Sequence, residues 1–190
     1  MRPQAIITIA ALLLVAITLL FLGPSGYEKL DDMQSLPAQT AAIREAFPEV
    51  EHISPKTMAL LIRGDTDMLV VDVRSSGEFE ASHIEGAVNL RALEDFEPYF
   101  RPLEPHRSPM RPRPQLIVVY GSIGKRSAEL ADELRLAGHP EVRNLAGSIF
   151  LWANEDRPLI DAEGNPATKV LSVARNQSLL LDAERRAEAR

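Results

Sequence analysis

The residue types that can hold an anion occur together in one seven-residue loop: Gly121, Ser122, Ile123, Gly124, Lys125, Arg126 and Ser127. The loop follows an apolar run that ends at Tyr120 and precedes a helical pattern. Backbone amides of a glycine-containing turn at a helix N-terminus form a positively polarised concavity, and two cations can add to it. The sequence therefore predicts a site for sulfate, phosphate or a partner's carboxylate. The alternative is that the amides only cap the helix and both cations are solvated.

The chain contains no cysteine. This excludes a thiolate nucleophile, a disulfide and a cysteine-ligated zinc from the chain itself. Ser122 would need an adjacent general base, and no Ser/His/Asp arrangement can be located in the sequence. His52, His106 and His139 lack the spacing of metal ligands, so we predict neither a metal nor a cofactor.

Composition limits the other classes of function. The net charge of -6 and the pI of about 5.3 argue against a nucleic-acid partner, which requires a clustered basic face. A chain of 190 residues supplies one core of ordinary domain size. We therefore expect one domain with accessory segments.

The N-terminal segment is strongly apolar. Residues 5–22 carry no charge and at about 1.5 Å per residue are long enough for a bilayer, so they predict a transmembrane signal-anchor helix. Arg2 precedes this segment and acidic residues dominate after it, which places residues 1–4 in the cytoplasm and the domain on the extracytoplasmic, periplasmic side. A cleaved signal peptide and a buried core helix are the alternatives.

The rest of the chain divides into a spacer, a domain and a tail. Residues 23–49 form the spacer, with one short helix near 38–47. Residues 50–160 form the domain, and residues 161–190 form a C-terminal tail whose charged end is a frayed helix or disordered. The proline- and arginine-rich stretch 101–114 predicts an extended loop, with a proline-motif docking site as the alternative.

Within the domain, strand and helix patterns alternate, which predicts a parallel α/β sheet. Ser54 and Gly64 flank a helix over 55–63, with Gly64 as a left-handed C-cap, and Gly138 ends a helix over 127–137. Apolar or β-branched runs predict strands over 51–53, 68–73, 87–90, 115–120 and 142–145.

Two sequence blocks resemble the rhodanese-like domain family. The first, residues 70–90, carries Asp72-Val73-Arg74, Glu78-Phe79 and His83-Ile84-x-Gly86-Ala87-x-Asn89. The second, residues 118–158, is similar to the family's active-site loop, its following helix and a closing Gly-x-x-x-x-Trp element. The resemblance implies a five-stranded parallel sheet flanked by helices, with the loop running from the central strand into a helix N-terminus.

Several residues of these blocks have structural interpretations. We expect Asp72 and Arg74 to form hydrogen bonds to neighbouring loops rather than to a ligand. We expect His83 to fix a turn, and Trp152 to pack its helix onto the sheet.

Active rhodaneses carry a persulfide-forming cysteine at the position that Gly121 occupies here. The resemblance therefore implies a catalytically inactive rhodanese-like protein. With the anchor predicted at residues 5–22 and the anion loop, we expect a membrane-anchored protein that binds thiosulfate, sulfate, phosphate or a protein partner. One alternative is an enzyme of sulfur relay or phosphoryl chemistry that uses a partner's thiol; the related dual-specificity phosphatases have a loop one residue longer. Another is a domain that only scaffolds a membrane complex.

Overall fold

The computed structural model describes residues 35–96, 99, 114–139 and 141–188. The anchor predicted at 5–22 and nearly all of the proline-rich loop at 101–114 lie outside these residues. Over the described ranges, no helix has both the length and the apolar character needed to cross a membrane.

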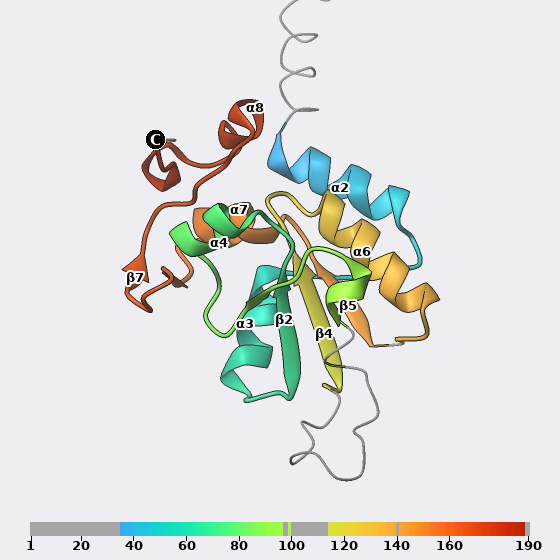
Figure 1. The fold of residues 1–190 in the computed structure, drawn as a ribbon. Helices are drawn as coiled ribbons and strands as arrows, with labels where there is room; N and C mark the ends of the chain where they lie inside the picture. The colour runs from blue at the N-terminus through green and yellow to red at the C-terminus, as the bar shows by residue number, and fades with distance from the viewer. Residues whose placement is uncertain (1–34, 97–98, 100–113, 140, 189–190) are drawn as a thin grey trace, which may run out of the picture.

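Five parallel strands form the central sheet, in the order β1-β5-β4-β2-β3 (Figure 1). The strands are β1 (Glu51–Ile53), β2 (Met68–Asp72), β3 (Val88–Asn89), β4 (Leu116–Tyr120) and β5 (Val142–Leu145). The predicted fold class is confirmed, and β4 is buried along its whole length, as expected for the middle of a parallel sheet. Both edge strands are short, with three residues in β1 and two in β3.

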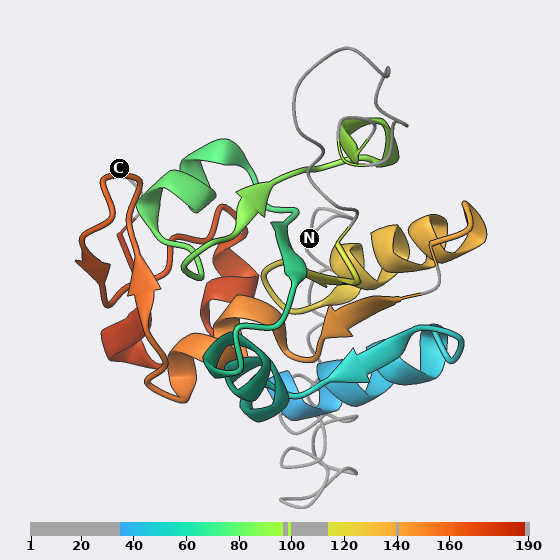
Figure 2. The same cartoon turned by 90° about the horizontal axis from the view of Figure 1, so that it is seen from below.

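Helices cover both faces of this sheet (Figure 2). The helices of the described residues are α2 (Leu36–Ala46), α3 (Pro55–Arg63), α4 (Ser76–Ala81), α6 (Lys125–Leu136), α7 (Ser148–Asn154) and α8 (Arg175–Ser178), with 3-10 turns η1 (Leu93–Phe96) and η2 (Ala183–Arg185). Alternate residues of β4 enter different cores because successive side chains in a strand point to opposite faces. Val118 and Tyr120 pack with α2, α3, α7 and the C-terminal residues, whereas Ile117 and Val119 pack with α6 and Phe96.

The helix boundaries confirm most of the capping signals. Ser54 caps α3 by accepting a hydrogen bond from the Thr57 amide, at 3.1 Å. The prediction of a left-handed Gly64 is wrong, because Gly64 has φ -81° and the left-handed residue is the following Asp65, at φ 50°. Gly138 ends α6 with φ 93°, as predicted.

The chain beyond Pro158 packs back onto the domain. Strands β6 (Leu159–Ile160) and β7 (Pro166–Ala167) form an antiparallel pair. Val170 donates to the Arg185 carbonyl and accepts from the Ala187 amide, so the expectation of a frayed or disordered end is wrong for residues 182–188. Local propensity missed this because tertiary contacts hold the segment: Val170 and Leu181 are each 1% exposed in the core.

This packing predicts that truncating Leu181 destabilises the domain. Leu181→Ala is expected to lower the free energy of unfolding by about 2–5 kcal/mol because it leaves a core cavity. Leu179→Ala is the matched control: Leu179 is 68% exposed, so its loss should change stability by less than about 0.5 kcal/mol. Urea denaturation of the full chain measures both, and equal effects would contradict the packing of this segment.

Candidate functional site

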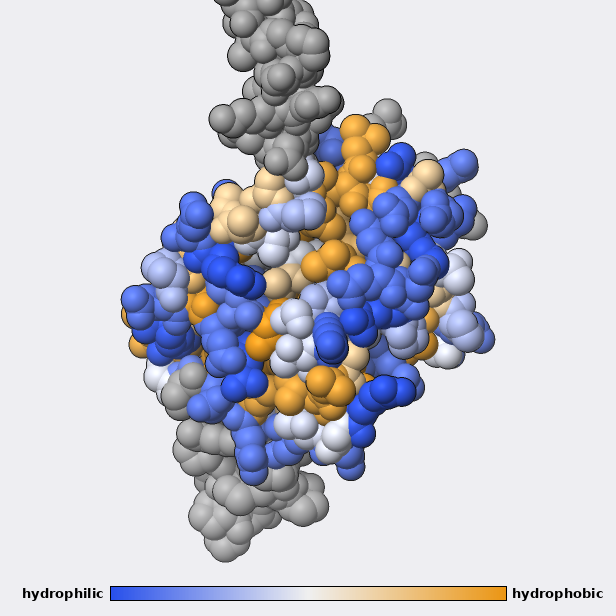
Figure 3. Space-filling model, turned by 180° about the vertical axis from the view of Figure 1, so that it is seen from behind, coloured by the Kyte–Doolittle hydropathy of each residue, from blue (hydrophilic) through white to orange (hydrophobic). Residues whose placement is uncertain are grey.

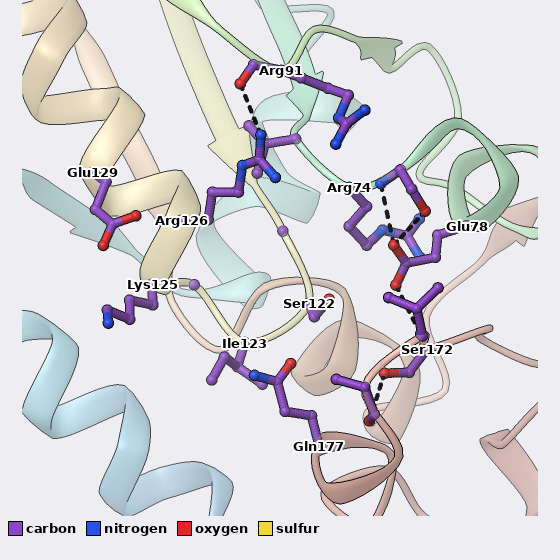
Figure 4. A pocket seen from close by; sticks show the side chains of 16 residues that line it. Arg74, Glu78, Arg91, Ser122, Ile123, Lys125, Arg126, Glu129, Ser172 and Gln177 are labelled. Atoms are coloured by element: carbon purple, nitrogen blue, oxygen red, sulfur yellow. Dashed lines mark hydrogen bonds between the residues drawn. The ribbon is translucent and has the colours of Figure 1, made fainter.

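The loop predicted from the sequence lies at the carboxyl end of the central strand β4 and leads into α6. This is the edge of an open α/β sheet where ligands generally bind. Residues 121–126 line a cavity of about 350 Å³ (Figure 4). Ser127, the last predicted site residue, is fully buried in the first turn of α6, beneath the loop. Helix α6 begins at Lys125, two residues earlier than predicted, because left-handed Gly124 serves as its N-cap.

The N-terminus of α7 fixes the first half of the loop. The Gly121 amide donates to Ser148 Oγ at 3.0 Å. The amides of Ile149 and Phe150 donate to the carbonyls of Gly121 and Ser122, both at 3.1 Å. These two carbonyl oxygens therefore point to α7. Because they are hydrogen-bonded there, they do not repel an anion bound on the loop.

Gly124 fixes the second half of the loop. Its φ of 110° lies in the left-handed region, which favours glycine. Its carbonyl accepts from the Ala128 amide at 3.0 Å, Ser127 Oγ at 3.1 Å and Asn144 Nδ2 at 3.3 Å. Three donors on one oxygen define the path of the chain into α6.

The start of α6 supplies the electrostatics of the site. The first-turn amides of this twelve-residue helix have no acceptor within the helix, and the helix dipole favours an anion there. Lys125 and Arg126 are exposed. In Figure 4 the Lys125 side chain extends away from Ser122, whereas Arg126 reaches toward Arg91 and donates to its carbonyl oxygen at 3.3 Å.

The opposite wall of the cavity comes from the first sequence block. Glu78, 4% exposed, accepts from the Ser75 amide at 3.1 Å and from Ser75 Oγ at 2.6 Å, which forms a capping box at α4. The second oxygen of Glu78 accepts from the Val173 amide at 3.4 Å. The carboxylate at this wall is thus bound to protein donors.

A third wall was missed by sequence reasoning. It consists of Ser172, Val173, Ala174 and Gln177, in the segment expected to be a tail. The sequence of this segment carries no motif that marks a site. Figure 4 shows Gln177 facing the loop beside Ile123.

Asp72 and Arg74 form a buried ion pair beside the cavity. Arg74 Nη2 lies 2.7 Å from Asp72 Oδ2, and the side chains are 2% and 0% exposed. Arg74 Nη2 also donates to the Ser82 carbonyl at 2.6 Å. The expected hydrogen bonds of these residues to the protein are therefore confirmed. Burial lowers the pKa of Arg74, but the charge and hydrogen bonds of Asp72 raise it more, so the guanidinium stays charged.

The same pair influences the last residue of β4. Tyr120 Oη accepts from the Ile84 amide at 3.1 Å. Complete burial, reinforced by the Asp72 charge, raises the pKa of Tyr120 well above its usual value. Tyr120 is therefore a neutral structural residue near neutral pH.

His83 and Trp152 also have the expected structural positions. His83 Nδ1 bonds to the Phe79 carbonyl at 2.9 Å, and the ring stacks on Phe79. Trp152 is 2% exposed and donates to the Pro158 carbonyl at 2.9 Å. No histidine is among the described residues that line the cavity, so no imidazole there can act as a general base for Ser122. Across the described ranges, no cluster of His, Asp or Glu has the arrangement of a metal site.

A side chain at Gly121 would fit tightly. A Cβ built there would lie 3.2 Å from Val73 Cγ2 and 3.8 Å from Ser127 Oγ, and the Gly121 φ lies outside the left-handed region. A small side chain therefore fits if the Val73 methyl moves by a few tenths of an ångström.

Comparison with known proteins agrees with this geometry. A family model described as a rhodanese-like domain matches residues 54–155. A sulfurtransferase of Allochromatium vinosum is 28% identical over 115 residues, 60% of this chain and 99% of that protein. The uncharacterized protein YibN of Escherichia coli K12 is 36% identical over 94 residues, and the match spans half of this chain and 62% of YibN. The crystal structure of BH2092 from Bacillus halodurans shares the fold, with a TM-score of 0.52 at 18% identity over 74% of this chain and 97% of that one.

Proposed function

This chain belongs to the rhodanese-like domain family, and on that premise we propose that it is a membrane-anchored binding member of the family that does not transfer sulfur. Its loop 121–127 holds a small oxyanion such as thiosulfate, sulfate or phosphate. The proposal rests on a loop that is hydrogen-bonded to α7 and leads into the N-terminus of α6, with glycine at the position of the family's cysteine.

The absence of a thiol argues against sulfur transfer by the chain alone. Sulfur transfer requires a soft nucleophile that ionises near neutral pH, and the whole sequence has no cysteine to provide it. Loss of a nucleophile typically costs about 10⁶ in rate, which the other groups of a site do not replace.

The arrangement of charges supports an oxyanion as ligand. The loop amides and the α6 dipole lie on one side of the cavity, and Arg91 lies at its rim with Arg126. Glu78 and Glu129 also line the cavity and oppose an anion. The Glu78 carboxylate is partly compensated by its three hydrogen bonds to the protein.

The proposal includes the anchor at residues 5–22, with the domain on the extracytoplasmic side. The chain enters α2 at the end of the molecule that also holds the carboxyl ends of the strands (Figure 1). Apolar side chains gather near this end in Figure 3, and Val173 and Leu179 are 72% and 68% exposed. An anchored domain would therefore present its cavity toward the membrane surface and toward anions or partners held there.

Calorimetry on the full chain in detergent tests the binding function. We expect sodium sulfate or thiosulfate to bind with a Kd of about 1 mM, or about -4 kcal/mol. Gly124→Ala should weaken binding about tenfold because alanine is strained at a φ of 110°. Gly77→Ala is the matched control: a Cβ there meets nothing within 4 Å, so binding should be unchanged.

Two results would contradict the proposal. One is thiosulfate:cyanide turnover by the wild-type chain at the level of an active rhodanese. The other is the absence of anion binding by a folded chain at low salt.

The cavity that Gly121 lines favours a second candidate function, in which a partner's thiol enters the cavity and the pair relays sulfur. A cysteine side chain at Gly121 would start from a Cβ 3.2 Å from Val73 Cγ2 and 3.8 Å from Ser127 Oγ. Mass spectrometry would support this function if a sulfane-sulfur adduct formed on the partner only when this chain was present. An adduct that forms equally well without the chain would rule it out.

A further inference from the structure

The loop is connected to the edge of the sheet through a buried amide. Asn144, on β5 and 1% exposed, directs its Nδ2 to two acceptors. One is the Gly124 carbonyl at 3.3 Å, and the other is Nδ1 of His52 at 3.1 Å. His52 and Asn144 are register partners on the neighbouring parallel strands β1 and β5.

The second ring nitrogen of His52 determines its tautomer. Nε2 lies 3.2 Å from the Phe47 carbonyl, which can only accept, so Nε2 carries the proton. Nδ1 is then free of hydrogen and accepts from Asn144 Nδ2. The two hydrogens of the amide nitrogen thus serve His52 and Gly124, and this arrangement requires a neutral imidazole.

We propose that neutral His52 is a positioning residue for the anion loop: it orients the Asn144 amide, which holds the Gly124 carbonyl, and protonation of the ring weakens anion binding. This inference rests on the proposed binding function and adds a residue outside the loop and outside the cavity lining.

Protonation leaves the amide without a satisfactory orientation. A proton on Nδ1 would face the N–H of Asn144 Nδ2, donor against donor. If the amide flipped, Oδ1 would accept from the ring but would then face the Gly124 carbonyl, acceptor against acceptor. In the first case the bond from Asn144 to Gly124 is kept only against this repulsion and is weakened, and in the second case it is lost.

The surroundings of His52 keep the ring neutral. Partial burial is the main cause that lowers its pKa, the Arg44 charge on α2 lowers it further, and the Phe47 hydrogen bond raises it less than these lower it. On β1 and β5, Glu51 and Arg143 pair with each other at 2.9 Å. The pKa of His52 therefore lies below the usual histidine value of about 6.5. The stability that the neutral ring gives the folded chain is present at neutral pH and is lost as the pH falls.

The direction of the pH effect separates positioning from simple electrostatics. A positive charge on His52 would by itself attract an anion and tighten binding at low pH. Release of Gly124 has the opposite effect. Weaker binding in acid therefore identifies the hydrogen-bonded route.

Sulfate is a suitable probe because its charge stays constant between pH 5 and pH 8. Calorimetry on the full chain at fixed ionic strength is expected to show about tenfold weaker sulfate binding at pH 5 than at pH 8. His52→Gln should remove this dependence, whereas His139→Gln should keep the wild-type profile. Nitrogen-15 NMR of the imidazoles at pH 8 should show the Nε2–H tautomer for His52.

The outcomes are separable. No sulfate binding at pH 8 refutes the proposed function itself. Binding at pH 8 that is unchanged or tighter at pH 5 overturns the positioning role, as does a His52→Gln chain that keeps the wild-type pH profile. If His52→Gln does not fold, an Nδ1–H tautomer for His52 in the wild-type spectrum overturns it instead.

Discussion

Gly121→Cys is expected to raise thiosulfate:cyanide sulfur transfer at least about 10³-fold over the wild-type chain, a part of the roughly 10⁶ that a catalytic nucleophile contributes. The new thiol would stand at the N-terminus of α6, where a helix dipole and backbone amides favour the thiolate. That thiolate would take the outer sulfur of thiosulfate, release sulfite and pass the sulfur to cyanide, giving thiocyanate.

Ser122→Cys is the matched control for this variant. It adds the same thiol one residue further along the loop, whose path is fixed by the bond from Phe150 N to the Ser122 carbonyl. We expect its rate to be at least about tenfold lower than that of Gly121→Cys, because a misplaced reacting atom loses proximity. Equal rates for the two variants, or a folded Gly121→Cys chain without a persulfide adduct, would show that the loop is not a preorganised cradle.

Arg74→Met is expected to lower the free energy of unfolding by about 3–5 kcal/mol. The change leaves the Asp72 carboxylate, whose side chain is fully buried, without its guanidinium partner, and removes the donor to the Ser82 carbonyl. Urea denaturation monitored by circular dichroism measures this loss.

Two further variants test the cause. Arg135→Ala removes an i,i+3 ion pair with Asp132 whose side chains are about one-third exposed, and it should cost less than about 1 kcal/mol. The double variant Asp72→Leu/Arg74→Met should cost less than Arg74→Met alone, since it leaves no isolated buried charge. A double variant that is less stable than Arg74→Met would contradict this explanation.

The strands were predictable because their physics is local to the sequence. The apolar, β-branched runs predicted at 68–73 and 115–120 contain β2 and β4, as strands buried on both faces should. Helix α3 was equally clear, since Ser54 and Pro55 specify its start. At the other end of α3, Asp65 takes the left-handed conformation that glycine usually provides. The prediction of Gly64 at this position was therefore wrong by one residue.

The site was predictable in its loop but not in its surroundings. Glycines, a serine and two cations after a strand mark residues 121–127, whereas the wall at Ser172 to Gln177 has no local signal. That wall depends on a contact across 95 residues, between Val173 and Glu78. The link from His52 to Asn144 spans 92 residues, and it forms because β1 and β5 are neighbours in the sheet.

The short outer strands have a consequence for how copies of the chain coexist. Aggregation by sheet extension needs a long row of unpaired amides and carbonyls, and β1 and β3 offer only three and two residues. If many copies were anchored in one membrane, their sheets would therefore resist joining edge to edge into fibrils. This holds although the inner strands β2 and β4 have a high β-propensity.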